Sequence, residues 1–387
     1  MDTDIKLDHR FLIDTLQKLI QINSVNPMLD PEAPGEEEIG SFLAQILQDM
    51  GLKPEIDTLK PGRVNVTAVL KGKGGGQSLM INGHMDTVGV HNMKEPFSGE
   101  ISVGRIFGRG SMDMKGGLAG ALAVAKALIE NKIRLKGDLV LAFVADEEYG
   151  SMGTEHLVKQ YQTDAAIVTE PTGLDLCLAH KGFGLFEFTT KGRAAHGSQP
   201  EKGIDANTNM GWIMTEIDRL SKKLESTPPH PLLGLPSLHI PVIKGGQEPF
   251  TYADKCRMKL ERRTLPRESK EEILSDLKAV IKRLSGRSDA FRAEVKTVFW
   301  REPYEIDKNK KIVRLLFDSV RELTGKEPSY IGHSWWEDSG ILAKAGIDTV
   351  IIGPKGGGLH SKEEWVDIQS VIDLAAVLYR VTLDFCC

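Results

Sequence analysis

The sequence predicts an α/β protein in which helices flank a mainly parallel sheet, with a second, α+β module inserted into it. Three observations predict this fold class. Short, continuously apolar segments recur along the chain, helical patterns fall between them, and one central stretch departs from that alternation. Apolar segments without polar alternation are typical of strands that are buried on both faces of a sheet.

The elements of the α/β pattern follow one another in a regular order. Residues 10–22 have the spacing of an amphipathic helix, and residues 35–50 predict a second helix that begins with glutamates and ends near Gly51. A third helix, 115–130, lies between two expected strands. The expected strands are residues 64–70, 78–82, 138–144, 164–169 and 348–352. This alternation indicates a parallel sheet that is covered by helices.

The stretch 181–297 follows another pattern, in which a strand, a helix, two strands, a helix and a strand succeed one another. This order is that of a ferredoxin-like module. The expected elements are strands 183–190, 237–243, 254–262 and 291–299 and helices 205–224 and 268–284. Because the stretch lies between two parts of the α/β pattern, we expect one domain from residues 1–180 and 298–387 and an inserted domain from 181–297.

Composition excludes several classes of partner. A net charge of −5 argues against nucleic acid or an anionic membrane as a main partner. None of the four cysteines lies in a C-x-x-C pattern, which favours reduced thiols in a cytoplasmic protein. The N-terminal segment MDTDIKLDHRFLID has acids where a signal peptide needs lysines and an apolar run. We therefore expect a cytoplasmic location.

Histidine, aspartate and glutamate side chains gather at or after the ends of the expected strands. They are His84 and Asp86 in NGHMDTV, Asp113 in GRGSMDMKGG, Glu147 and Glu148 in VADEEYG, Glu170 in IVTEPT and His360 in GGGLH. In an open α/β sheet such residues share the crevice outside the carboxyl ends of the strands. So many acids in one crevice repel one another when they are uncompensated, and bound divalent cations would remove that repulsion. Oxygen and imidazole donors without thiolates suit zinc, cobalt or manganese.

Each of these motifs has a structural explanation when it is taken alone. An aspartate before a helix is usually a cap or turn residue, and a Glu-Glu pair is usually solvated. Their order and their common position at strand ends favour the metal site. The chain has neither an H-E-x-x-H nor a G-x-S-x-G motif, so two other hydrolase designs lack support.

Taken together with GPKGGGLHSKEEWVD, these motifs resemble those of the dinuclear-zinc aminoacylase family. That family contains acetylornithine deacetylase, succinyl-diaminopimelate desuccinylase and carboxypeptidase G, and the resemblance extends over nearly the whole chain. It implies a catalytic domain that binds two divalent metal ions, with zinc expected and cobalt or manganese as alternatives. It also implies that the inserted domain is a lid and the dimerisation surface of a homodimer, and that the peptide bond between Asp113 and Met114 is cis.

The resemblance assigns a role to each residue of the constellation. Glu147 would be the general base, which takes a proton from a metal-bridging water and gives it to the leaving amine. Asp86 would accept a hydrogen bond from the second ring nitrogen of His84 and fix its tautomer. The implied metal ligands are Asp113 as the bridge, His84 and Glu170 at one ion, and Glu148 and His360 at the other.

The inserted domain carries two further candidates. His196 in KGRAAHGSQP would reach the active site of the neighbouring subunit and stabilise the oxyanion. Arg263 in LERRTLP would bind a substrate carboxylate, with Arg262 as the alternative. Phe250 departs from the family pattern, because it falls where the family often has an asparagine.

The resulting functional expectation is a metal-dependent amidohydrolase of amino-acid metabolism that cleaves the amide bond of N-acyl-L-amino acids. A carboxypeptidase or dipeptidase on the same dinuclear site is the alternative within enzymes. A catalytically silent relative that only binds metal or ligand is the alternative of another class. The intact Glu147 favours an enzyme, since a silent protein does not need a base at that position.

Overall fold

The computed structural model describes residues 7–387 and leaves the first six residues of the MDTDIKLDHRFLID segment outside the described part. The described chain divides into two compact units. Unit 1 contains the residues up to Leu178, Ile306–Ile331 and Glu337–Cys387, and unit 2 contains Ala179–Glu305 and Gly332–Trp336. Within residues 7–387, no helix is both long and apolar enough to cross a membrane.

The centre of unit 1 is the parallel part of a mixed sheet. Four neighbouring strands run parallel, in the order β6 (Leu139–Val144), β3 (Leu79–His84), β7 (Ala165–Val168) and β15 (Asp348–Ile351). β2 (Arg63–Leu70) pairs antiparallel with β6. All five strands that the apolar segments predicted are therefore present, and nearly all their residues are buried, as expected for strands with both faces covered.

Further strands, among them the antiparallel β1 (Glu55–Lys60), β8 (Leu176–His180) and β13 (Tyr304–Glu305), extend this sheet at its two edges. β1 pairs with β2 at one edge. At the other edge β8 pairs with β13 and β14 (Tyr330–His333). The mainly parallel α/β class predicted for this region is confirmed, with antiparallel additions that the apolar pattern did not reveal.

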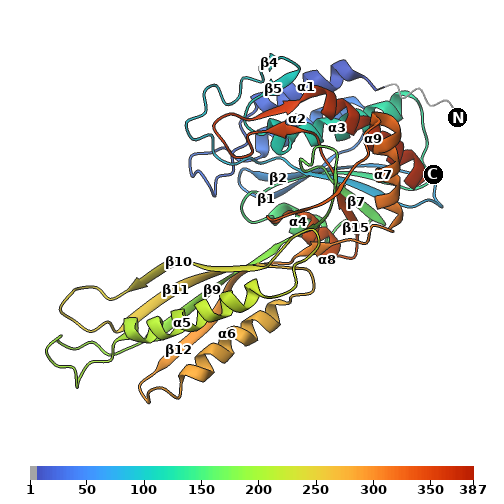
Figure 1. Cartoon of the computed structure of the whole chain (residues 1–387). Coiled ribbons are helices and arrows are strands. Elements are labelled where there is room, and N and C mark those ends of the chain that lie inside the picture. The colour runs from blue at the N-terminus through green and yellow to red at the C-terminus, as the bar shows by residue number, and fades with distance from the viewer. Residues whose placement is uncertain (1–6) are drawn as a thin grey trace. The chain divides into compact units, whose positions relative to one another are not determined.

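Helices cover both faces of the sheet in unit 1 (Figure 1). One layer contains α1 (His9–Gln21), α3 (Gly116–Glu130), α9 (Ile368–Cys386) and α7 (Lys311–Thr324), which pack side by side. α4 (Met152–Leu157) and α8 (Ser339–Lys344) lie on the opposite side. The remaining helix, α2 (Glu37–Asp49), packs on β1 and β2.

A small four-stranded sheet brings two distant loops of unit 1 together. Its order is β16 (Gly356–Gly357), β17 (Trp365–Asp367), β5 (Arg105–Phe107) and β4 (Ile101–Ser102). β5 leads into a π-helical turn, η1 (Ser111–Lys115), and β16 and β17 enclose the His360 loop. The expected cis peptide bond between Asp113 and Met114 is present in η1.

Unit 2 contains the six elements of a ferredoxin-like module in the predicted order. They are β9 (Gly182–Lys191), α5 (Ala206–Glu225), β10 (Ser237–Gly245), β11 (Lys255–Thr264), α6 (Lys270–Leu284) and β12 (Arg292–Arg301). The strands form an antiparallel sheet in the order β10-β11-β9-β12.

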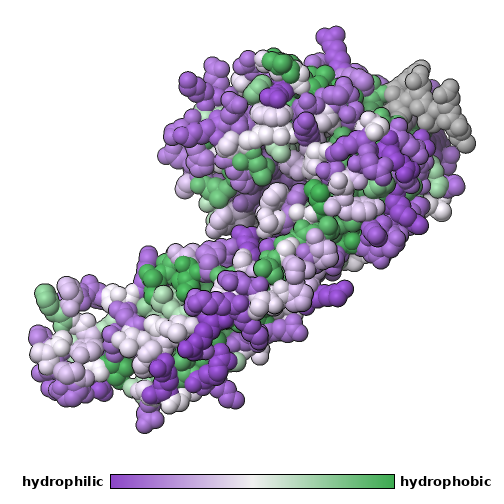
Figure 2. All heavy atoms as spheres, in the orientation of Figure 1, coloured by the Kyte–Doolittle hydropathy of each residue, from purple (hydrophilic) through white to green (hydrophobic). Residues whose placement is uncertain are grey.

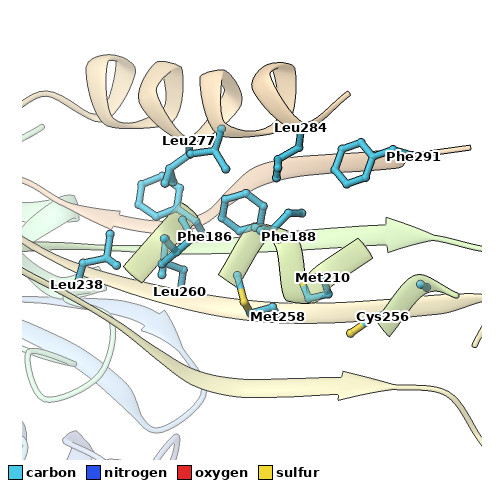
Figure 3. Packing of buried hydrophobic residues seen from close by; sticks show 14 of the residues in the cluster. Phe186, Phe188, Met210, Leu238, Cys256, Met258, Leu260, Leu277, Leu284 and Phe291 are labelled. Atoms are coloured by element: carbon cyan, nitrogen blue, oxygen red, sulfur yellow. The ribbon is translucent and has the colours of Figure 1, made fainter. Parts of the chain in front are cut away.

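The core of unit 2 lies between this sheet and its two helices. Phe186 and Phe188 of β9 pack against Leu277 and Leu284 of α6 and against residues of α5 such as Met210 (Figure 3). Alternate residues of β11 are buried in the same core, as the period of two in its sequence requires. Figure 2 shows that hydrophilic residues cover much of the visible surface of each unit.

Candidate metal centre

The strand order of unit 1 brings the predicted ligands to one edge of its sheet. His84 is the last residue of β3, Glu147 and Glu148 follow β6, and Glu170 follows β7. Because β6, β3 and β7 are parallel neighbours, the residues that follow them emerge at the same edge. Asp113 comes to this edge from η1, and His360 comes from the loop between β16 and β17.

The five predicted ligands form two groups that share Asp113. His84 Nε2 lies 3.0 Å from Asp113 Oδ1 and 3.2 Å from Glu170 Oε1. His360 Nε2 lies 3.1 Å from Asp113 Oδ2 and 3.3 Å from Glu148 Oε2. Each oxygen of Asp113 therefore faces a different histidine, as a bridging carboxylate does.

The donor set and its spacing fit two divalent cations. Ligands about 2.0–2.2 Å from a tetrahedral zinc ion are roughly 3.3–3.6 Å from one another, close to the separations in both groups. The cluster also contains four carboxylates, those of Asp113, Glu147, Glu148 and Glu170. Their combined negative charge exceeds the positive charge that two protonated imidazoles can supply. Such an excess of buried negative charge is strongly unfavourable without a compensating cation.

Protons compensate part of this charge while cations are absent. Burial and the neighbouring Asp113 raise the pKa of Glu148 to about 7, although His360 opposes the shift. Contacts with the carboxylates of Asp113 and Glu148 raise the pKa of His360 to about 10. Cations that occupy this cluster must therefore displace protons from it.

Glu147 lies beside the group that contains His84 and Glu170. One ligand atom from each of these three side chains falls within 4.8 Å of the others. Burial raises the pKa of Glu147 well above that of an ordinary carboxyl group; His84 opposes the shift, and the charges of Glu170 and Asp338 add to it. A carboxyl group with a raised pKa next to a metal cluster is suited to accept and release a proton near neutral pH.

Asp86 makes different contacts from those expected. His84 Nδ1 lies 2.9 Å from the main-chain oxygen of Asp86, whereas the Asp86 carboxylate is 3.6 Å away. A ring N–H that donates to the main-chain oxygen leaves Nε2 free for a metal, so the tautomer is fixed by the backbone. The carboxylate instead accepts hydrogen bonds from the amides of Glu147, at 3.1 Å, and Glu148, at 3.2 Å.

One residue that organises the centre escaped the sequence analysis. Glu364 lies in the sequence SKEEWVD, directly before β17. Its carboxylate accepts hydrogen bonds from the amides of Gly110, Met112 and Asp113 at 3.0–3.1 Å. Arg109 Nη1 donates to the same carboxylate at 2.6 Å, and both side chains are buried. This carboxylate fixes the Asp113 loop to the loop that carries His360. Its position four residues after His360 was the available signal.

The candidate residues of unit 2 differ from one another in exposure and in their contacts. His196 is exposed, with Nδ1 2.7 Å from Ser198 Oγ. Arg262 is buried and donates to the main-chain oxygens of Ser237 and Arg263. The Arg263 guanidinium is partly exposed, lies 5.0 Å from the Phe183 ring and is paired with Glu261. Arg263 is thus the more accessible of the two arginines.

Two histidine–carboxylate groups that share an aspartate, at the carboxyl edge of a parallel sheet, define a candidate site for two metal ions. The chain belongs to the peptidase family M20/M25/M40, whose model matches residues 80–384. It is accordingly a metallohydrolase that acts on amide or peptide bonds.

Similar proteins extend over nearly the full length of the chain. An N-formyl-4-amino-5-aminomethyl-2-methylpyrimidine deformylase of Halalkalibacterium halodurans is 27% identical, with 96% of this chain and 95% of the relative covered. An acetylornithine deacetylase of Aliivibrio fischeri is 30% identical, with 96% and 98% covered. The structure of aminopeptidase PepT from Bacillus cereus has a TM-score of 0.80 at 20% identity and covers 98% of this chain and 100% of its own, which shows the common fold.

Proposed function

We propose that this chain is a metal-dependent deacylase that hydrolyses the amide bond of N-acyl-L-amino acids. The proposal rests on one observation. The two carboxylate oxygens of Asp113 face His84 and His360 in separate histidine–carboxylate groups, and Glu147 lies beside the His84 group. The names of the two relatives above support removal of a small acyl group, because a deformylase and a deacetylase each release one from an amine.

The proposed ligands of the two cations follow the two groups of the structure. When bound, divalent cations neutralise the carboxylates, polarise the amide carbonyl and lower the pKa of water. Asp113 would bridge them, and hydrogen bonds from its loop to Glu364 hold it in place. The remaining ligands would be His84 and Glu170 at one cation and Glu148 and His360 at the other.

Glu147 would act as the general base. Cations close to its carboxylate favour the ionised form, whereas burial favours the protonated form, and these opposed effects keep the group ready to exchange a proton near neutral pH. Glu147 would accept a proton from the attacking water and then deliver it to the nitrogen of the leaving amine.

The residues of unit 2 extend this proposal to the substrate. Arg263 would bind the carboxylate of an N-acyl amino acid, which is supported by its accessible, planar guanidinium on the Phe183 ring. Its partner Glu261 would have to share or release it. His196 would act on the neighbouring subunit of a homodimer, where its imidazole would stabilise the oxyanion.

A hydrolysis screen tests the proposal. The purified chain, loaded in turn with zinc, cobalt or manganese, is assayed on N-formyl, N-acetyl and N-succinyl amino acids and on dipeptides. We expect at least one N-acyl amino acid to have a kcat/KM about tenfold or more above that of any dipeptide. A preference for dipeptides would instead establish the peptidase alternative. A metal-loaded chain that cleaves none of these compounds would overturn the proposed substrate class.

A further inference from the structure

A network of buried polar side chains adjoins the main chain of Glu147 and Glu148, the two glutamates that follow β6. It contains Glu36, Arg63, Asn26, Asp86 and Asp146, each with a relative exposure of 3% or less. These residues come from widely separated parts of the sequence. Asn26 lies before α2, Glu36 precedes α2 directly, Arg63 begins β2, and Asp146 comes just before Glu147.

The hydrogen bonds of this network run from Glu36 to the main chain of Glu147. Arg63 donates to both carboxylate oxygens of Glu36, at 2.6 and 2.8 Å, and to Asp146 Oδ1 at 2.9 Å. Asn26 Nδ2 donates to Asp146 Oδ1 at 3.0 Å and to Asp86 Oδ2 at 2.8 Å. The Asp86 carboxylate in turn accepts the amide of Glu147.

The backbone at Asp146 shows why such a network is needed. Asp146 has a φ of 71°, in the left-handed region that residues other than glycine seldom adopt. A conformation of this kind persists where the surroundings enforce it, and such residues cluster at active sites. Asn26 and Arg63 both bind the Asp146 carboxylate, so they hold the residue that sets the direction in which Glu147 leaves the strand.

A purely structural role explains the network less well. It buries the carboxylates of Glu36 and Asp146 against the guanidinium of Arg63, and it adds the Asp86 carboxylate through Asn26, so one guanidinium serves three buried carboxylates. A buried ionic cluster is often no more stabilising than apolar residues of the same volume, so stability alone does not account for it. Hydrogen bonds, in contrast, fix the orientation of a carboxylate or an amide, which apolar side chains cannot do.

We propose that Asn26 and Arg63 are positioning residues for Glu147. They act through Asp146 and Asp86, which hold the main chain on either side of the Glu147 amide, and they need not touch the substrate. The proposal depends on the function proposed above only in that Glu147 is the general base.

The principal test is Asn26→Ala in the metal-loaded enzyme. Partners of this kind typically contribute tenfold to hundredfold to activity, so kcat should fall by about that factor, with KM and metal content little changed. The matched control is Asn65→Ala. Asn65 is equally buried, but it bonds to the main chain of Gly153 and Ala145 and not to Asp86 or Asp146. We expect its kcat to stay within about threefold of the wild type.

Two further readouts separate positioning from general damage. In a Glu147→Gln background, Asn26→Ala should cause almost no additional loss, because residues that act as a unit are non-additive. In the metal-free chain, amide hydrogen exchange at Glu147 and Glu148 should accelerate in Asn26→Ala and not in Asn65→Ala. This second readout does not depend on activity.

The network is also open to a test from its other end, should Asn26→Ala fail to fold. Arg63→Lys keeps the charge, but its single ammonium cannot reproduce the forked contacts with Glu36 and Asp146, so a partial loss of kcat is expected. An unchanged kcat in both variants would overturn the proposal. So would an equal loss in Asn65→Ala, or a loss that persists in full when Glu147 is replaced. If Glu147→Gln alone retained full activity, the assignment of the base would fail, whereas the exchange result would still stand.

Discussion

Replacement of Glu147 by glutamine isolates its proton chemistry from its shape. Glutamine has almost the same volume, and the hydrogen bond from the amide of residue 147 to Asp86 is a main-chain contact that survives the change. The new side chain cannot accept and release a proton, however. A general base typically contributes 10²–10⁴-fold, so kcat should fall by about this factor, which corresponds to roughly 2.7–5.5 kcal/mol of transition-state stabilisation.

The neighbouring glutamate provides the matched control. Glu148 Oε2 lies 3.3 Å from His360 Nε2, so Glu148→Gln should weaken binding of the second cation. The two variants are compared by steady-state kinetics and by metal content after dialysis. Glu147→Gln should keep both metals, and Glu148→Gln should lose one. The opposite pattern would mean that the two roles are reversed, and unchanged hydrolysis in both variants would refute the dinuclear mechanism.

Four other predictions follow from contacts described above. Glu364→Ala leaves the Arg109 guanidinium buried without its anion, so the free energy of unfolding in urea should fall by about 3–5 kcal/mol. Arg263→Ala should raise KM about tenfold or more for an N-acyl amino acid, with little effect on an N-acyl amine that lacks the carboxylate. Metal affinity, measured by competition with a chelator, should increase from pH 6 to pH 8, because protons held by Glu148 and His360 must leave. His196→Ala should lower kcat in a protein that sediments as a dimer.

Each of these expectations has a result that contradicts it. A stable Glu364→Ala protein with an unchanged metal site would show that the Asp113 loop keeps its conformation without Glu364. Equal losses on both substrates would remove Arg263 from carboxylate recognition. Metal affinity that is independent of pH would mean that the cluster carries no displaceable protons. A fully active monomer would exclude a role of His196 in a neighbouring subunit.

The parts of the fold that were predictable from the sequence share one property, a periodic or continuous apolar pattern. The buried strands β3, β6 and β7 are continuous apolar segments, and the elements of unit 2 alternate with the periods of strands and helices. The strands β4, β5, β16 and β17 contain only two or three residues each, which is too few to show a period. They form because the loops around them are held by tertiary contacts.

The candidate site shows the same division. The positions of His84, Glu148 and Glu170 depend on the ends of β3, β6 and β7, which the sequence located, whereas Asp113 and His360 come from η1 and the β16–β17 loop. The contacts of Asp86 depended on how closely the segment after β6 approaches, and the spacing of His84 and Asp86 contains no information about that approach. Glu36, Arg63 and Asn26 form hydrogen bonds with Asp146, from which they are separated by 83 to 120 residues of sequence. No local pattern could therefore have indicated these contacts.

The distribution of the proposed ligands along the chain also determines the order in which the centre can be completed during synthesis. His84, Asp113, Glu148 and Glu170 all belong to the first half of the sequence, whereas His360 and Glu364 are made nearly 200 residues later. The strand β15, which lies beside β7 in the parallel sheet, is made only just before them. A ribosome-bound chain that ends before residue 348 thus has every side chain of the His84 group and two of the three in the other group, where only His360 is missing. The complete pair of sites can arise only after the last part of the chain has folded back onto the first.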